Sequence, residues 1–280
     1  MNMLELLPFA AVGVMSAIYA VGVDKLWRHG LGRGVTVCRV VSFYAGLAAV
    51  VVALASPLDE MAAAWFSFHM IQHLVLILAA PPLLVYGSPL TPMTLALPQR
   101  TRRQLHRWGR SGLASRATTA VRNPVTSGIL LAAALWAWHL PKLYEGAVLD
   151  AALHGLEHAS FLGAALLFWA VVIGAARRPR SDYGPAMLLV FVTGLQSAAL
   201  AAILIFSPVV LYPVHDGGGA GRLSPLEDQQ LAGAIMWTPM GLVLLATVIT
   251  LLARWLMSLD ARMERSPVGA QADPMEWSEP

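Results

Sequence analysis

The chain is poor in the residues that soluble proteins use for surface charge and for covalent cross-links. Only 12% of its 280 residues are charged, and Cys38 is its single cysteine. Soluble domains usually carry about 25% charged residues, so an ordinary soluble domain is excluded. One cysteine also excludes an intrachain disulfide and a cluster of thiolate ligands. Nucleic-acid binding is disfavoured, because the net charge of +3 is not spread along the chain.

Apolar residues, in contrast, make up 57% of the chain and gather in seven stretches. A helix needs ~20 apolar residues to cross a bilayer. We therefore predict an all-α membrane protein, a seven-helix transmembrane bundle forming one domain over residues 1–257. A polar cytoplasmic tail over residues 258–280 is predicted to be disordered. The expected spans are Leu6–Val23, Val35–Ala55, Met61–Val85, Pro124–Leu140, Ala151–Ala176, Pro185–Ser207 and Gln230–Met257.

The basic residues predict the orientation of these spans. With the spans placed as above, only Lys142 and Arg222 fall on one side of the membrane, and every other lysine and arginine falls on the opposite side. The positive-inside rule then puts the N-terminus outside and the C-terminus in the cytoplasm. A light-driven pump is excluded as well. Its retinal Schiff base needs a lysine in the last span, and the only lysines are Lys25 and Lys142.

The longest inner loop, Leu97–Asn123, holds seven arginines and no acidic residue. Two interpretations are open. Residues Arg100–Arg110 can form a short amphipathic helix that lies on the anionic inner leaflet. Alternatively, the segment is a solvated basic loop that only fixes the topology.

Five of the eight histidines fall in the predicted outer half of the membrane. They are His69, His73, His139, His154 and His158. Four of them form two pairs spaced four residues apart, so that each pair lies on one face of a helix. Polar side chains inside a bilayer are costly and mark functional sites. Because imidazole is the commonest metal ligand, this pattern predicts a metal or haem site.

Further candidates lie at matching depth in the fifth and seventh spans. Met236 and Met240 are one turn apart and can offer soft thioether ligands, while Glu157 is expected to orient a neighbouring imidazole as a second-shell group. Asp228 and Gln229 are expected to cap the outer end of the last span. Gln196 is expected to form a hydrogen bond between helices.

The donor set leaves the cofactor open. Imidazole with thioether and no thiolate fits copper best, and zinc is an alternative that the ligands alone do not separate from it. One haem held by a histidine from each of two spans is a third possibility. The string His154-x-x-Glu157-His158 also matches an inverted zinc-protease pattern, in which the acid is the general base. An intramembrane metalloprotease is therefore an alternative.

Several motifs together resemble a known family. They occur in this order: Phe68–Leu74, Ala80–Leu84, Trp138–Tyr144, His154–Phe161 and Asp228–Trp237. This combination resembles the multi-span CtaG family of cytochrome c oxidase assembly factors and covers the third to seventh spans. The resemblance implies a multi-pass protein of the bacterial inner membrane, needed to make active haem-copper oxidase and suspected of a part in copper insertion.

Residues and resemblance together predict a copper-binding assembly factor that catalyses no reaction. It would accept an ion from the periplasmic side, where copper carriers can supply it, and pass it to a subunit of a haem-copper oxidase. His69, His73 and His158 are the expected primary ligands, with His154 and His139 nearer the entrance. A haem-handling protein, the metalloprotease and a purely structural scaffold for oxidase subunits are the alternatives.

Overall fold

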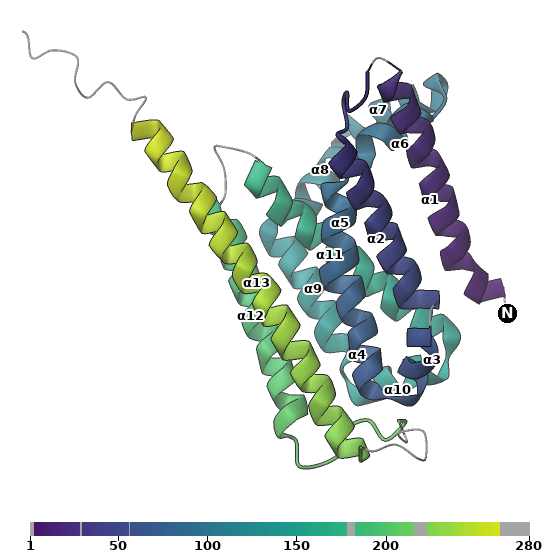
Figure 1. Cartoon of the computed structure of the whole chain (residues 1–280), viewed down its shortest axis with the longest axis vertical. Helices are drawn as coiled ribbons and strands as arrows, with labels where there is room; N and C mark the ends of the chain where they lie inside the picture. The colour runs from purple at the N-terminus through teal and green to yellow at the C-terminus, as the bar shows by residue number, and fades with distance from the viewer. Residues whose placement is uncertain (1–2, 29, 56, 178–182, 216–222, 264–280) are drawn as a thin grey trace, which may run out of the picture.

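The computed structural model describes residues 3–28, 30–55, 57–177, 183–215 and 223–263. Over this part of the chain the fold is entirely helical, and Figure 1 shows the long helices lying side by side in a bundle. The elements are α1 Met3–Trp27, α2 Val37–Ala55, α3 Pro57–Ala64, α4 Phe66–Leu74, η1 Val75–Ala79, α5 Ala80–Tyr86, α6 Leu90–Ala96, α7 Gln99–Gly109, α8 Gly112–Val121, α9 Pro124–Trp138, α10 Pro141–Leu149, α11 Ala151–Arg177, α12 Tyr183–Phe206 and α13 Pro225–Met263.

Six helical segments of the described residues are long and apolar enough to cross a membrane, and they lie at six of the seven expected spans. The fourth expected span, Pro124–Leu140, is shorter than predicted. Its helix, α9, has 15 residues and ends at Trp138, which gives about 22 Å of the ~30 Å of bilayer hydrocarbon. The physical reason is Pro141, which disfavours the helical conformation at Leu140 and begins a separate helix, α10. Seven spans and their orientation stay a prediction.

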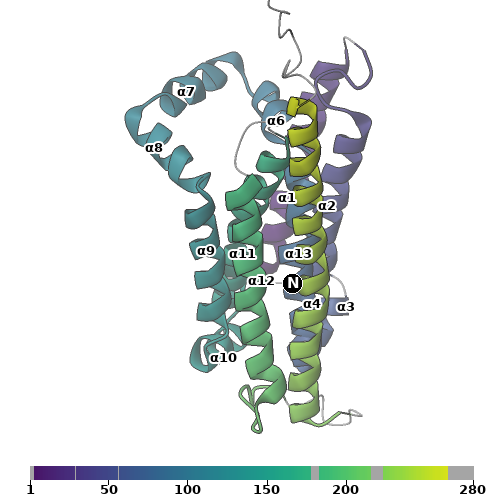
Figure 2. The ribbon, with the colours of Figure 1, turned by 90° about the vertical axis from the view of Figure 1, so that its left-hand side faces the viewer.

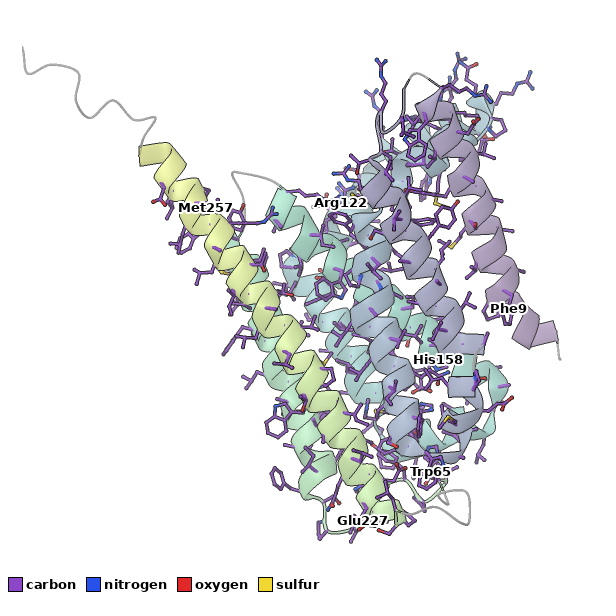
Figure 3. All side chains as sticks on the ribbon, in the orientation of Figure 1. Phe9, Trp65, Arg122, His158, Glu227 and Met257 are labelled. Atoms are coloured by element: carbon purple, nitrogen blue, oxygen red, sulfur yellow. The ribbon has the colours of Figure 1, made fainter. Side chains whose placement is uncertain are left out.

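The two ends of the bundle differ in charge. In Figure 3, Arg122 and Met257 lie toward one end and Trp65 and Glu227 toward the other. We call the first of these the basic end. Two basic side chains there bind the C-terminal carbonyls of neighbouring helices: Lys25 donates to Leu95 and Ala96 at 3.0 Å, and Arg177 donates to Tyr86 at 2.9 Å. Cations at helix C-termini are favoured by the helix dipole.

The arginine-rich segment contains a helix, as one of the two interpretations requires. This helix, α7, runs from Gln99 to Gly109, has no buried residue and exposes Trp108 to 68%. Figure 2 shows α7 and α8 beside the main bundle at the basic end. Contact of α7 with anionic lipid stays a prediction. The last helix, α13, continues to Met263, past the boundary expected after residue 257, and residues 264–280 lie outside the described part.

The third span is interrupted by a π-helical turn, η1, which begins at Val75, two residues after His73. It is followed by Pro81 and Pro82, which have no N–H group. The carbonyl of Ile77 therefore lacks a donor at both the fourth and the fifth residue after it. The indole Nε1 of Trp169 on α11 donates to this carbonyl at 2.9 Å. Trp169 thus ties α11 to the third span one turn beyond the histidines.

We expect Trp169→Phe to lower the free energy of unfolding by about 1–3 kcal/mol, because it strands the buried Ile77 carbonyl without a donor. Thermal unfolding of the purified protein in detergent measures this change. The control is Trp255→Phe on the exposed face of α13, which removes the same indole from a site that is 40% exposed. Equal melting temperatures of the two variants would contradict the role of the hydrogen bond.

Candidate metal centre

Two helices far apart in the sequence bring four imidazoles together. His69 and His73 lie on α4, and His154 and His158 lie on α11. Across the helices, the ring centroids of His69 and His154 are 5.4 Å apart and those of His73 and His158 are 5.5 Å apart. Within each helix the two rings are 4.2 Å apart. Figure 3 places His158 in the half of the bundle that is away from the basic end.

The spacing across the helices fits shared coordination of an ion. With a metal–nitrogen distance of ~2.0 Å and bond angles from tetrahedral to linear, two imidazoles on one ion have ring centroids ~5–6 Å apart. The pairs His69–His154 and His73–His158 both fall in this range. They form two tiers: His73 and His158 each lie one helical turn farther along the chain than His69 and His154. The first tier, His69 and His154, therefore lies farther from the basic end than the second tier, His73 and His158.

Glu157 lies among these imidazoles and not behind them. Its side chain is fully buried, with one carboxylate oxygen 3.9 Å from His69 Nε2 and the other 3.6 Å from His73 Nε2. Ligand atoms of His69, His154 and Glu157 all lie within 4.8 Å of one another. From its sequence position, Glu157 was expected only to orient a neighbouring imidazole, and it does not share the helix face of His158. It is, however, three residues after His154 and so shares that histidine's face.

The cluster concentrates buried polar atoms that have no hydrogen-bond partner among the described residues. Buried polar groups in folded proteins are nearly always hydrogen-bonded, so each exception needs an explanation. Imidazole nitrogens and carboxylate oxygens are also the donors that copper and zinc accept. The donor set therefore fits a metal ion. The atoms are Nε2 of His69, His73, His154 and His158, Nδ1 of His73, and both carboxylate oxygens of Glu157.

The fifth predicted histidine, His139, lies at the C-terminal end of α9. It is buried, and its Nδ1 lies 2.7 Å from the carbonyl of Leu135. Because a carbonyl only accepts, Nδ1 carries the proton and Nε2 has the lone pair. The ring contacts found among the described residues join the other four histidines and do not include His139. Its role as a ligand stays a prediction.

Met236 and Met240 lie in the main apolar core. Both are buried on α13 and belong to the same cluster as Met70 and Phe66 of α4. This packing accounts for their burial, and their role as soft ligands stays a prediction. Gln196 forms the hydrogen bond between helices that was expected, accepting from Trp136 Nε1 on α9 at 2.8 Å.

Asp228 has a role other than the expected one. It caps α4 and not its own helix, because its carboxylate accepts from the backbone N–H groups of Phe66 at 2.7 Å and Ser67 at 3.3 Å. Its own helix, α13, begins at Pro225, five residues before the expected start. The N-terminal turn of α13 is held by Ser224 and Glu227, whose side chains and backbone bond each other at 2.7–3.3 Å. This reciprocal pair is a capping box.

Gln229 also acts on a neighbouring segment. Its Oε1 accepts from the backbone N–H of Leu211 at 2.6 Å, and its Nε2 donates to Leu204 and Val209. The start of α13 therefore positions both α4 and the segment that follows α12.

One further histidine beside the cluster, His215, was not among the predicted ligands. It lies between α12 and α13, is 4% exposed, and its ring centroid lies 6.1 Å from that of His69. Tyr144 Oη lies 2.6 Å from its Nε2. No periodic pattern can reveal such a residue, because it lies on no regular element and its neighbours in space come from α4 and α10.

These observations define a helical membrane protein with a buried cluster of imidazoles and one carboxylate away from its basic end. The model of the cytochrome c oxidase caa3 assembly factor family (Caa3_CtaG) matches residues 17–258. The chain belongs to this family.

Three curated relatives from mycobacteria are similar to most of the chain, and all three are described as uncharacterised. Those of Mycobacterium bovis and Mycobacterium tuberculosis are each 29% identical over 252 residues, which is 88% of this chain and 38% of the relative. That of Mycobacterium leprae is 25% identical over 248 residues, 86% of this chain and 37% of the relative. The chain thus spans less than two fifths of the length of these relatives. No solved structure matches it.

Proposed function

We propose that this assembly factor binds copper at the histidine cluster, in the outer half of the bacterial inner membrane, and passes it to an oxidase subunit. The family description supplies the process, which is assembly of cytochrome c oxidase. The observation that carries the metal assignment is the set of buried donors on α4 and α11 that have no hydrogen-bond partner among the described residues. The proposal includes seven spans with the N-terminus outside, so that the cluster lies on the periplasmic side.

The two tiers suggest how an ion is taken up and released. His69, His154 and Glu157 form the group with the closest donors, and His154 is the only one of these three that is not fully buried. We therefore assign entry to the first tier and deeper binding to His73 and His158. Two neighbouring sets of similar donors allow stepwise ligand exchange, so that a bound ion is held yet can leave. His139, Met236 and Met240 remain candidate ligands for transfer.

The choice of copper over zinc rests on the oxidase that is assembled and not on the donor atoms alone. Imidazole and carboxylate accept either ion, whereas the assembly of a haem-copper oxidase requires copper. Periplasmic copper carriers and the oxidase subunit are the corresponding partners. The family description names an assembly role, and we assign no catalysed reaction to the chain.

The test is elemental analysis and an absorption spectrum of protein purified in detergent from cells grown with copper. We expect about one copper ion per chain in the wild type and almost none after combined His69→Ala and His154→Ala replacement, which removes two of the three closest donors. The control is His106→Ala, which removes an exposed imidazole of α7.

Three results would overturn the copper assignment. Copper that survives the double replacement would mean that the cluster does not hold it. A haem Soret band would support a haem-handling protein. Zinc alone would support the metalloprotease alternative, with Glu157 as general base.

A further inference from the structure

An additional imidazole reaches the cluster from the segment between α12 and α13. His215 is buried, and its ring centroid is 6.1 Å from that of His69, which lies at the edge of the ~5–6 Å expected for two imidazoles on one ion. By comparison, His69 and His158 are 6.3 Å apart inside the cluster. His215 is therefore as close to His69 as one of the predicted ligands is.

Tyr144 forms a hydrogen bond with one ring nitrogen of His215. The phenol oxygen of Tyr144 on α10 lies 2.6 Å from His215 Nε2. An ordinary phenol has a pKa of about 10, so Tyr144 keeps its proton at neutral pH. With the His215 proton on Nδ1, Tyr144 is the donor and His215 Nε2 the acceptor. The Nε2 lone pair cannot bind an ion while this hydrogen bond exists.

The same two residues belong to an aromatic layer at the end of the cluster opposite the basic end. The ring centroids of Tyr144 and Tyr212 are 4.5 Å apart, those of Phe66 and Tyr212 are 4.7 Å apart, and the ring of Phe66 stacks on that of His215. Phe66 begins α4 and lies one turn before His69. An ion that leaves the first tier toward this end must therefore pass the layer, where His215 is the imidazole within reach.

We infer that His215 is an exchange ligand for the copper that the cluster binds. Tyr144 holds it aside, and His215 gives up this hydrogen bond to donate its Nε2 lone pair to the ion during loading and release. The phenol keeps its proton, so the step needs no acid, base or redox partner. This inference rests on the proposed function and adds to it the residue that carries the ion across the layer.

The test measures how fast purified protein takes up Cu(I) and how fast excess chelator removes it, by stopped-flow absorption. We expect His215→Ala to slow both rates about tenfold while the equilibrium affinity changes less than about threefold, because a transient ligand acts in both directions. Tyr144→Phe releases Nε2 and is expected to speed both rates by about two- to tenfold, the range that one neutral hydrogen bond sets.

Two matched variants test whether His215 binds copper or whether the aromatic layer only blocks the path of the ion. The His215→Gln side chain can still accept the Tyr144 hydrogen bond but offers no imidazole, so it should exchange copper as slowly as His215→Ala. Tyr212→Phe removes a different hydrogen bond of the same layer, the 2.7 Å bond to the His139 carbonyl. It should leave both rates within about twofold of the wild type. Melting temperatures confirm that each variant is folded.

The outcomes distinguish this inference from the proposal it rests on. A wild-type protein that takes up no Cu(I) overturns both. A wild type that loads copper, with His215→Gln exchanging at the wild-type rate, overturns only the exchange ligand. The same holds if Tyr212→Phe speeds exchange as much as Tyr144→Phe, because the layer would then act as a plug alone.

Discussion

Glu157→Gln is expected to lower the affinity for copper at least ~100-fold and to raise the stability of the metal-free protein. Even an outer-shell group typically contributes 10–100-fold to metal affinity, and Glu157 lies among the donors themselves. In the metal-free protein, however, neither of its buried oxygens has a hydrogen-bond partner among the described residues. The amide NH2 of the variant can donate to the nearby Nε2 of either His69 or His73, so the variant should gain about 1–3 kcal/mol.

The two effects have opposite signs, and one measurement reveals both. Ligand binding raises the melting temperature according to the affinity and the ligand concentration. Unfolding curves in detergent should therefore show a wild type that copper stabilises strongly and a Glu157→Gln variant that starts higher and barely responds. The control is Glu60→Gln, which makes the same change at an exposed position of α3. A variant that is less stable without metal and still responds fully to copper would make Glu157 a structural residue.

The sequence was sufficient to predict six helices long enough to cross a bilayer, because the length of an apolar run is visible in the sequence. It was less reliable where local backbone chemistry sets a helix boundary. The predicted fourth span continues to Leu140, but its helix ends at Trp138, since the residue preceding Pro141 avoids the helical conformation. In the last span the apolar run begins only at Gln230, but α13 begins at Pro225. Ser224, Pro225 and Glu227 start the helix earlier through their capping interactions. Both signals are present in the sequence.

The site could be predicted only in part, for a different reason. Spacing along one helix places His69 with His73 and His154 with His158, and it also places Glu157 with His154. Which helices face each other depends on packing of the whole bundle, which no local pattern encodes. The pairing of α4 with α11, and the approach of His215, therefore required the structure. The same holds for Asp228, whose partner lies on a helix more than 150 residues earlier in the chain.

Asp228→Ala is expected to lower the free energy of unfolding by about 2–4 kcal/mol and to weaken copper binding at the same time. Trp65 is extended, with φ −125° and ψ 127°, and separates α3 from α4. The first N–H groups of α4 consequently have no partner in the preceding turn, and Asp228, 2% exposed, accepts two of them. Its carboxylate also lies at the positive end of the α4 dipole.

Loss of this cap should make the position of His69 less well defined, because His69 lies one turn into α4. Asp228→Asn keeps one acceptor oxygen and should cost less than Asp228→Ala, because charge-assisted bonds are about twice as strong as neutral ones. Glu227→Ala is the control: it removes an exposed carboxylate that caps only α13, so it should lower stability less than Asp228→Ala. Thermal unfolding with and without copper measures all three variants. If Asp228→Ala matched Glu227→Ala in both stability and copper response, the cap would not be what holds α4, and with it His69, in place.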